Sequence, residues 1–96
     1  DEEEVLYGKI AEGEYWVDGK CELEEFFELY GLKLDDDIES NTVGGWVTEI
    51  YGGIPTVGEI IKFKFLEIKV VKATRQKVLK IRSRRTEGEN IHEDDE

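Results

Sequence analysis

Few side chains in this sequence could do chemistry, and no pattern among them is typical of an active site. The 96 residues include one cysteine, Cys21, and one histidine, His92. Nucleophilic catalysis pairs a serine or cysteine with a histidine in a folded region, whereas His92 stands in an acidic run where a solvated side chain is expected. Neither a GxxxxGK phosphate loop nor a dinucleotide-binding GxGxxG motif occurs. We therefore expect no enzyme activity and no bound cofactor.

Three adjacent carboxylates, Asp35, Asp36 and Asp37, are the candidate metal ligands. Carboxylate oxygens suit hard cations, but a calcium loop places its ligands at alternate positions and has a glycine at the sixth. That spacing is absent from the polar segment that contains them. A solvated acidic loop is therefore favoured over a specific metal site.

A glycine pair, Gly44 and Gly45, is the candidate anion site. It lies in the stretch TVGGWVTEIYGGIPTVG at 42–58, where Thr42 can cap a helix that begins at Val43. Each helical glycine costs about 1 kcal/mol relative to alanine, so something must compensate for two of them in one turn. Either their bare N–H groups meet an anion, or the turn packs closely against another backbone. Because 42–58 contains no Lys or Arg, we favour close packing.

Two short helices should position these candidates. Apolar residues occur at helical spacing in 22–30 and in 43–51. Gly31 and Gly52, which follow these segments, should terminate the two helices. Cys21 falls at the predicted N-cap of the first helix, where a thiol is a weak hydrogen-bond acceptor. A redox role for Cys21 is the less favoured alternative.

Strands should account for most of the remaining residues. A hairpin is predicted from 6–10 and 14–18, and alternating apolar positions from Ile60 to Ser83 indicate antiparallel strands with one buried face. The turns near Lys64 and Thr74 lack glycine, which disfavours type I′ hairpins and favours a bend or a looser loop. Two adjacent valines, Val70 and Val71, indicate either a strand covered on both faces or a β-bulge.

The predicted fold class is therefore α+β, with two short helices packed on a mainly antiparallel sheet. Its expected core contains the apolar residues of the helices and strands, namely Leu23, Phe26, Phe27, Trp46, Val47, Ile50, Ile68, Val70 and Ile81.

Charge is distributed unevenly along the chain, whose net charge is −11. Residues 1–59 hold 17 acidic and 3 basic side chains, 60–85 hold 1 and 10, and 86–96 hold 6 and 0. We expect an acidic linker at 1–4, one domain at 5–85 and a disordered acidic tail at 86–96. The start at Asp-Glu-Glu-Glu, without Met, leads us to expect a segment of a longer protein. No apolar run approaches a membrane span of about 20 residues, so no direct membrane insertion is expected.

Basic side chains alternate with apolar ones along the predicted C-terminal strands. They are Lys62, Lys64, Lys69, Lys72, Lys77, Lys80 and Arg82. Solvated strand exteriors are the favoured interpretation, and a surface for phosphate or lipid headgroups is the alternative. The acidic total opposes nucleic acid, so we expect no nucleic-acid partner.

Four motifs in order resemble the transporter-associated (CorC/HlyC) domain. They are the strand and Asp-Gly turn of EYWVDG, the helix that ends in Gly-Leu, the Thr-x-Gly-Gly helix start, and the turn GGIPTVGE. The resemblance covers about Ile10 to Ser83. That domain stands at the C-terminus of membrane proteins with cystathionine-β-synthase (CBS) domains, named as hemolysins or magnesium and cobalt efflux proteins, and its fold is related to a domain of flavin (FAD-binding) enzymes.

The resemblance implies a non-catalytic regulatory or interaction domain that modulates divalent-cation (Mg/Co) transport or efflux. The implied partners are the CBS and membrane domains of its own parent protein, with a homodimer as a further option, and the implied location is the cytoplasmic side of the cell membrane. The alternative is a domain that binds a small ligand, either a nucleotide or a flavin-like molecule.

Overall fold

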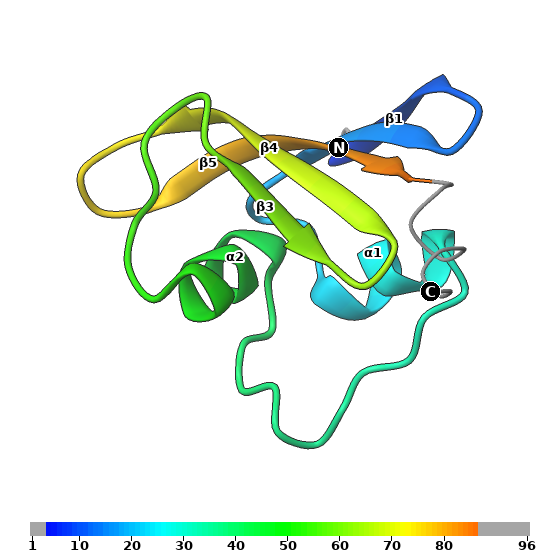
Figure 1. The fold of residues 1–96 in the computed structure, drawn as a ribbon, viewed down its shortest axis with the longest axis horizontal. Coiled ribbons are helices and arrows are strands. Elements are labelled where there is room, and N and C mark those ends of the chain that lie inside the picture. The colour runs from blue at the N-terminus through cyan, green and yellow to red at the C-terminus, as the bar shows by residue number, and fades with distance from the viewer. Residues whose placement is uncertain (1–3, 87–96) are drawn as a thin grey trace, which may run out of the picture.

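Within residues 4–86, which the computed structural model describes, five strands form one antiparallel sheet and two helices lie on one of its faces (Figure 1). The strand order is β1-β2-β5-β4-β3. The strands are β1 (Tyr7–Ala11), β2 (Glu14–Asp18), β3 (Ile60–Phe63), β4 (Leu66–Ala73) and β5 (Val78–Arg85), and the helices are α1 (Leu23–Leu29) and α2 (Val43–Tyr51). The predicted α+β class is confirmed. Of the predicted linker and tail, only Glu4 and Thr86 lie within the described residues.

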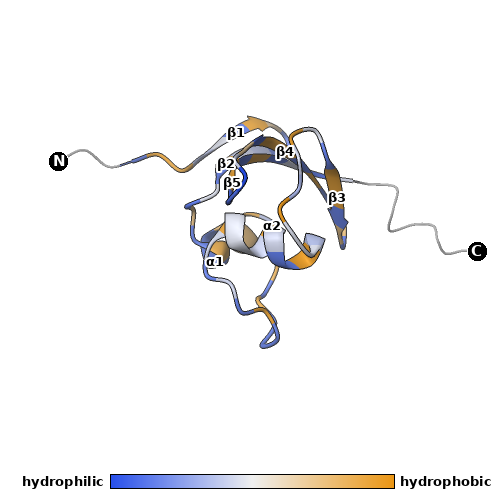
Figure 2. Cartoon of the chain, turned by 90° about the vertical axis from the view of Figure 1, so that its left-hand side faces the viewer, coloured by the Kyte–Doolittle hydropathy of each residue, from blue (hydrophilic) through white to orange (hydrophobic). Residues whose placement is uncertain are grey.

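The sheet has one covered and one open face because apolar and polar residues alternate along its strands. On β4, Leu66, Ile68 and Val70 are buried toward the helices, while Lys69 is exposed. Figure 2 shows both helices beneath the sheet and none above it. The pairing of β4 with β5 shifts register between Val70 and Lys72, which confirms the predicted bulge and leaves Val71 exposed.

The β3–β4 turn is tighter than predicted. Phe63 pairs directly with Leu66, so only two residues connect the strands, and the expectation of a looser loop there is wrong. Lys64 takes the left-handed conformation, with φ 56°, that glycine would ordinarily supply.

The β4–β5 connection is the looser loop of four residues that was predicted, because Ala73 pairs with Val78. Here the Thr74 hydroxyl accepts hydrogen bonds from the backbone N–H groups of Gln76 and Lys77. This side chain organises the turn without glycine.

Backbone pairing joins the starts of the two helices. Thr42 caps α2 as predicted, since its hydroxyl accepts from the Gly45 N–H at 3.2 Å. Cys21 is not the N-cap of α1; that position is Glu22, which makes no side-chain cap. The Leu23 N–H instead donates to the Asn41 carbonyl at 2.9 Å, so the segment before α2 supplies a hydrogen-bond acceptor for the first N–H of α1.

The core lies between the helices and the covered face of the sheet, with Trp46 at its centre. Eight of the nine expected core residues are buried, and Ile50 is half-buried against them. The Trp46 ring meets the rings of Phe27 and Phe63 edge to face, at centroid distances of 5.2 and 5.0 Å. Further buried residues that the expected core omitted include Val17, Cys21, Tyr30, Val43, Leu66 and Val78.

Candidate functional site

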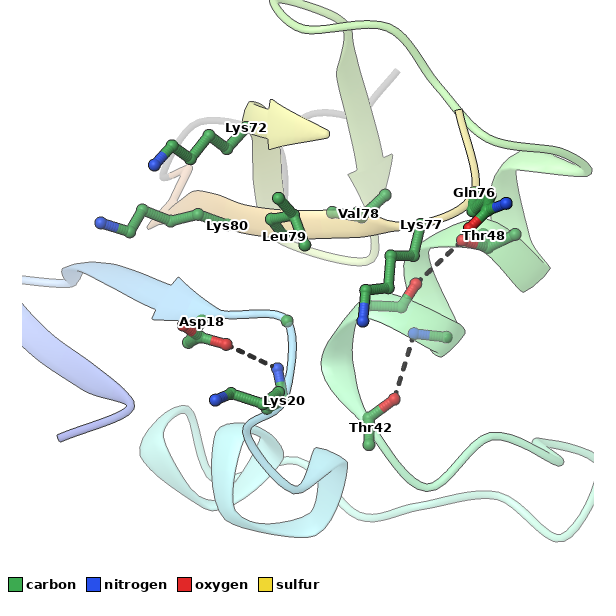
Figure 3. Close-up of a pocket in the computed structure, with 13 residues that line it drawn as sticks. Asp18, Lys20, Thr42, Thr48, Lys72, Gln76, Lys77, Val78, Leu79 and Lys80 are labelled. Carbon is green, nitrogen blue, oxygen red and sulfur yellow. Dashed lines mark hydrogen bonds between the residues drawn. The ribbon is translucent and has the colours of Figure 1, made fainter. Parts of the chain in front are cut away.

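A cleft of about 800 Å³ opens where three segments meet: the turn after β2, the start of α2, and the β4–β5 loop with the beginning of β5 (Figure 3). The floor of this cleft is backbone at Gly19 and Gly44. The Gly44 N–H donates to the Gly19 carbonyl at 2.9 Å. A Cβ on Gly44 would lie 2.8 Å from the Val78 carbonyl oxygen, so only glycine fits here without movement. This contact supports the favoured packing interpretation for Gly44, whereas Gly45 is exposed and its nearest neighbours are side-chain atoms of Thr42 and Ser40.

The first backbone donors of α2 already have partners within the protein. The Val43 N–H donates to the Cys21 carbonyl, the Gly44 N–H to Gly19, and the Gly45 N–H to the Thr42 hydroxyl. A helix N-terminus attracts anions mainly through such N–H groups when they are unpaired. The geometry therefore argues against the alternative in which the amides of Gly44 and Gly45 form an anion cradle.

Positive charge reaches the cleft from elsewhere in the chain. Its lining includes Lys20 from the turn after β2, Lys72 from β4, Lys77 from the β4–β5 loop and Lys80 from β5. Sequence reasoning missed this cluster because its members are separated by up to 60 residues. The pairing of β4 with β5 sets Lys72 opposite Lys80, so a correct prediction of this hairpin would have brought these two lysines together.

The four lysines differ in how far they are already paired. Lys20 forms an ion pair with Glu4 at 2.9 Å, and the hydrogen bond to Glu4 raises the pKa of Lys20. The Lys80 ammonium lies 5.0 Å from the centroid of the Trp16 ring. Within residues 4–86, Lys72 and Lys77 have no carboxylate within ion-pair distance. Asp18, the one acidic residue among those described that lines the cleft, accepts a hydrogen bond from the backbone N–H of Lys20 at 2.8 Å.

A second feature is the basic sheet face, by which we mean the open face with Lys62, Lys69, Lys72, Lys80, Arg82 and Arg84. Two of its members are neutralised locally, because Arg82 pairs with Glu14 and Arg84 with Glu67, each at 2.7 Å. The lysines of this face carry the remaining positive charge.

The opposite side of the molecule is acidic. We call this the acidic helix layer: α1, α2 and their connection, with Glu22, Glu24, Glu25, Glu28, Asp35, Asp36, Asp37, Glu39 and Glu49, all exposed. The candidate metal ligands Asp35, Asp36 and Asp37 belong to this layer. Within residues 4–86, no three His, Cys, Asp or Glu side chains converge as a metal site would require.

The position of Cys21 does not suit a reactive thiol. Its side chain is fully buried, and burial raises the pKa of Cys21 to about 11, with a further contribution from nearby Glu25. A protonated, buried thiol is a poor nucleophile, so the structure gives no support to a redox role. His92 lies outside the described residues.

The fold defines a class of small α+β domain in which two helices cover one face of an antiparallel sheet. Within residues 4–86, no helix is long and apolar enough to span a membrane. The family model for the transporter associated domain (CorC_HlyC) matches residues 8–87, and the chain belongs to this family.

Proteins similar in sequence and structure carry names that match this family. The chain is 31% identical over 81 residues to the magnesium and cobalt efflux protein CorC of Buchnera aphidicola, and 25% identical over 81 residues to CorC of Escherichia coli. The aligned segments cover 84% of this chain but only 28% and 27% of those proteins, so the chain spans about a quarter of their length. Among solved structures, the transporter associated domain of Nitrosomonas europaea superimposes with a TM-score of 0.79 and 27% identity, covering 88% of this chain and all of that one.

Proposed function

We propose that this domain is a non-catalytic regulatory module of a membrane protein that transports or exports divalent cations such as Mg²⁺ or Co²⁺. It works on the cytoplasmic side, through contacts with the CBS and membrane domains of its own protein. Its family and the CorC relatives, which are about four times as long as the matched segment, support a role as one part of a larger transporter.

The observation that carries this proposal is the separation of charge between the two sides of the domain. Lysines on the basic sheet face, such as Lys62 and Lys69, lie on the opposite side of the sheet from Glu24 and Glu25 of the acidic helix layer. Opposite patches of this kind orient a domain against charged partners and disfavour wrong orientations. The open sheet face also leaves Trp16 half-exposed, and tryptophan is enriched at protein contacts.

A protein partner suits the basic sheet face better than lipid or nucleic acid. Each Lys or Arg gains about 1 kcal/mol near an anionic membrane, but Glu14 and Glu67 neutralise two arginines of the face. The net charge of −11 further opposes approach to an extended anionic surface. A local acidic patch on another domain avoids this long-range repulsion, because salt screens charges beyond about 8 Å.

Lysine labelling of the full-length protein that contains this chain tests the proposed contact. Acetylation with a water-soluble reagent, read by mass spectrometry, should be slower at Lys62 and Lys69 in the full-length protein than in the isolated chain. Lys33, an exposed lysine in the α1–α2 connection, is the internal control and should react equally in both. Equal labelling of Lys62 and Lys69 in the two forms would refute a contact through the basic sheet face.

A second candidate function, the binding of a small ligand, is favoured by one observation, the lysine-lined cleft. The cleft shares Lys72 and Lys80 with the basic sheet face, but Lys62 and Lys69, which test the regulatory contact, do not line it.

A further inference from the structure

Four lysines surround the cleft in a protein that is otherwise strongly acidic. Among residues 4–86 the lining holds Lys20, Lys72, Lys77 and Lys80 and one carboxylate, Asp18, whereas the whole chain has 24 acidic and 13 basic side chains. Close positive charges repel one another, and Lys72 and Lys80 stand directly opposite on paired strands, an arrangement that costs stability unless an anion offsets it. Within residues 4–86 no carboxylate pairs with Lys72 or Lys77, so their exposed ammonium groups are available to an anionic ligand.

The lysines approach the cleft from different sides. Figure 3 shows Lys72 and Lys80 extending in the same direction from neighbouring strands, while Lys77 reaches from the β4–β5 loop toward the start of α2. Lys20 lies on the turn after β2, and its ammonium group is paired with Glu4. The lysines that line the cleft therefore come from four segments of the chain, two of them neighbouring strands.

We propose that this cleft binds a small ligand bearing a chain of phosphates, either a nucleotide di- or triphosphate or a free oligophosphate. An ammonium group is a compact point charge with three donors and is a common phosphate ligand. At least three negative charges are needed to match Lys72, Lys77 and Lys80, and an oligophosphate carries them within a small volume. The cleft, at about 800 Å³, is within the range of small-molecule sites.

The side chains supply the recognition, because the backbone donors of the cleft are occupied. The N–H groups of Gly19, Gly44 and Gly45 all donate within the protein. The glycines of the floor instead let α2 lie close against the turn that carries Lys20 and against Val78, which follows Lys77. The packing role of Gly44 and the proposed anion site are thus compatible.

Titration of the 96-residue chain followed by amide NMR and calorimetry tests the proposal. The probes are sodium tripolyphosphate, ATP and adenosine, each without divalent metal and at about 0.15 M salt. Tripolyphosphate and ATP should both bind and shift the amide resonances of Gly19, Gly44 and Val78, and adenosine should not. Tighter binding of ATP than of tripolyphosphate would identify a nucleotide as the ligand, and equal binding an oligophosphate.

Matched variants separate the cleft from general electrostatics. Lys72→Gln with Lys77→Gln should weaken binding of tripolyphosphate by about tenfold or more, because two charged hydrogen bonds are lost. Lys62→Gln with Lys69→Gln makes the same charge change at exposed strand positions outside the cleft. This second double variant should weaken the binding of tripolyphosphate far less. Circular dichroism and melting of both variants verify that each remains folded.

Three outcomes would overturn the proposal. The first is no binding of either phosphate probe by the folded wild-type chain, and the second is an equal loss of affinity in the two double variants. The third is tighter binding of a poly-glutamate peptide than of tripolyphosphate, which would make the cleft a docking site for an acidic polypeptide. None of these bears on lysine labelling in the full-length protein, so the regulatory proposal can stand or fall separately.

Discussion

Gly44 of α2 and Gly19 of the turn after β2 lie backbone against backbone, joined by a hydrogen bond of 2.9 Å from the Gly44 N–H to the Gly19 carbonyl. A Cβ on Gly44 would lie only 3.3 Å from the Cα of Gly19, and a Cβ on Gly19 would collide with the Val78 carbonyl oxygen. The helix start, the turn and β5 therefore converge at a point that admits no side chain. This junction sets the position of α2 on the sheet and of the lysines around the cleft.

Gly44→Ala should destabilise the domain by about 1–3 kcal/mol, because the new methyl group meets rigid backbone at Val78 and Gly19. Gly45→Ala is the matched control in the same helical turn. Its nearest neighbours are the hydroxyls of Thr42 and Ser40 at 3.2 and 3.4 Å, which can shift, and alanine gains about 1 kcal/mol of helix propensity. Thermal unfolding should therefore rank Gly44→Ala below Gly45→Ala, and the reverse order would show that the close contact is misplaced.

Trp46→Ala should cost about 3–5 kcal/mol of unfolding free energy, since it empties the centre of the core between Phe27 and Phe63. Trp16→Ala removes the same side chain from the open sheet face and should cost about 1 kcal/mol or less. Urea unfolding of the two variants checks the difference. If they prove equally unstable, Trp46 does not occupy the buried position described above.

Tyr30 and Ser83 form a buried polar pair whose hydroxyl oxygens lie 2.9 Å apart. Each hydroxyl also has a backbone acceptor within reach, the Gly13 carbonyl for Tyr30 and the Tyr15 carbonyl for Ser83. Because each hydroxyl has one proton, one of them donates to the other, and the second donates to its carbonyl. Tyr30→Phe and Ser83→Ala should each cost about 1 kcal/mol. In a double-mutant cycle the two costs should sum to more than the cost of the double variant, by about 0.5 kcal/mol or more. Strict additivity would mean that the hydroxyls do not interact.

Cys21 should make the stability of the domain fall at alkaline pH. Burial raises the pKa of Cys21 to about 11, whereas an unfolded thiol has a pKa of about 8.5. Between these values the unfolded state loses its proton first, so the stability that Cys21 contributes is complete below about pH 8.5 and is lost as pH rises toward 11.

Melting temperatures of the wild type and Cys21→Ala, measured from pH 7 to 10.5, test this expectation. The wild type should lose stability more steeply, because all other ionisable groups are shared by the two proteins. Parallel pH profiles, or rapid reaction of the folded wild type with a thiol reagent at pH 8, would contradict the buried position of Cys21.

Local patterns predicted the elements well because each depends on neighbouring residues. The helix Val43–Tyr51, its Thr42 cap and the bulge after Val70 all follow from spacing and capping chemistry within a few positions. The cap of α1 could not be predicted, since its acceptor is the Asn41 carbonyl, which reaches Leu23 only through tertiary pairing. Lys64 supplies positive φ in place of glycine, which no residue pattern indicates.

The candidate site was less predictable for the same reason. The glycine pair marked one wall of the cleft, but the absence of Lys or Arg within 42–58 pointed away from any positive charge there. Lys20, Lys72, Lys77 and Lys80 border one cleft only when β5 lies between β2 and β4, a strand order that alternation along single strands does not specify.

The most direct test of the regulatory role is the rate of divalent-cation transport by the full-length protein in proteoliposomes. We expect Lys62→Glu with Lys69→Glu, which reverses charge on the basic sheet face, to reproduce the change in rate caused by deleting residues 5–85. Glu24→Lys with Glu25→Lys, an equal reversal on the acidic helix layer, should leave a rate closer to that of the wild type. Wild-type transport by the deleted protein, or by the Lys62 and Lys69 double variant, would contradict a regulatory contact through the basic sheet face.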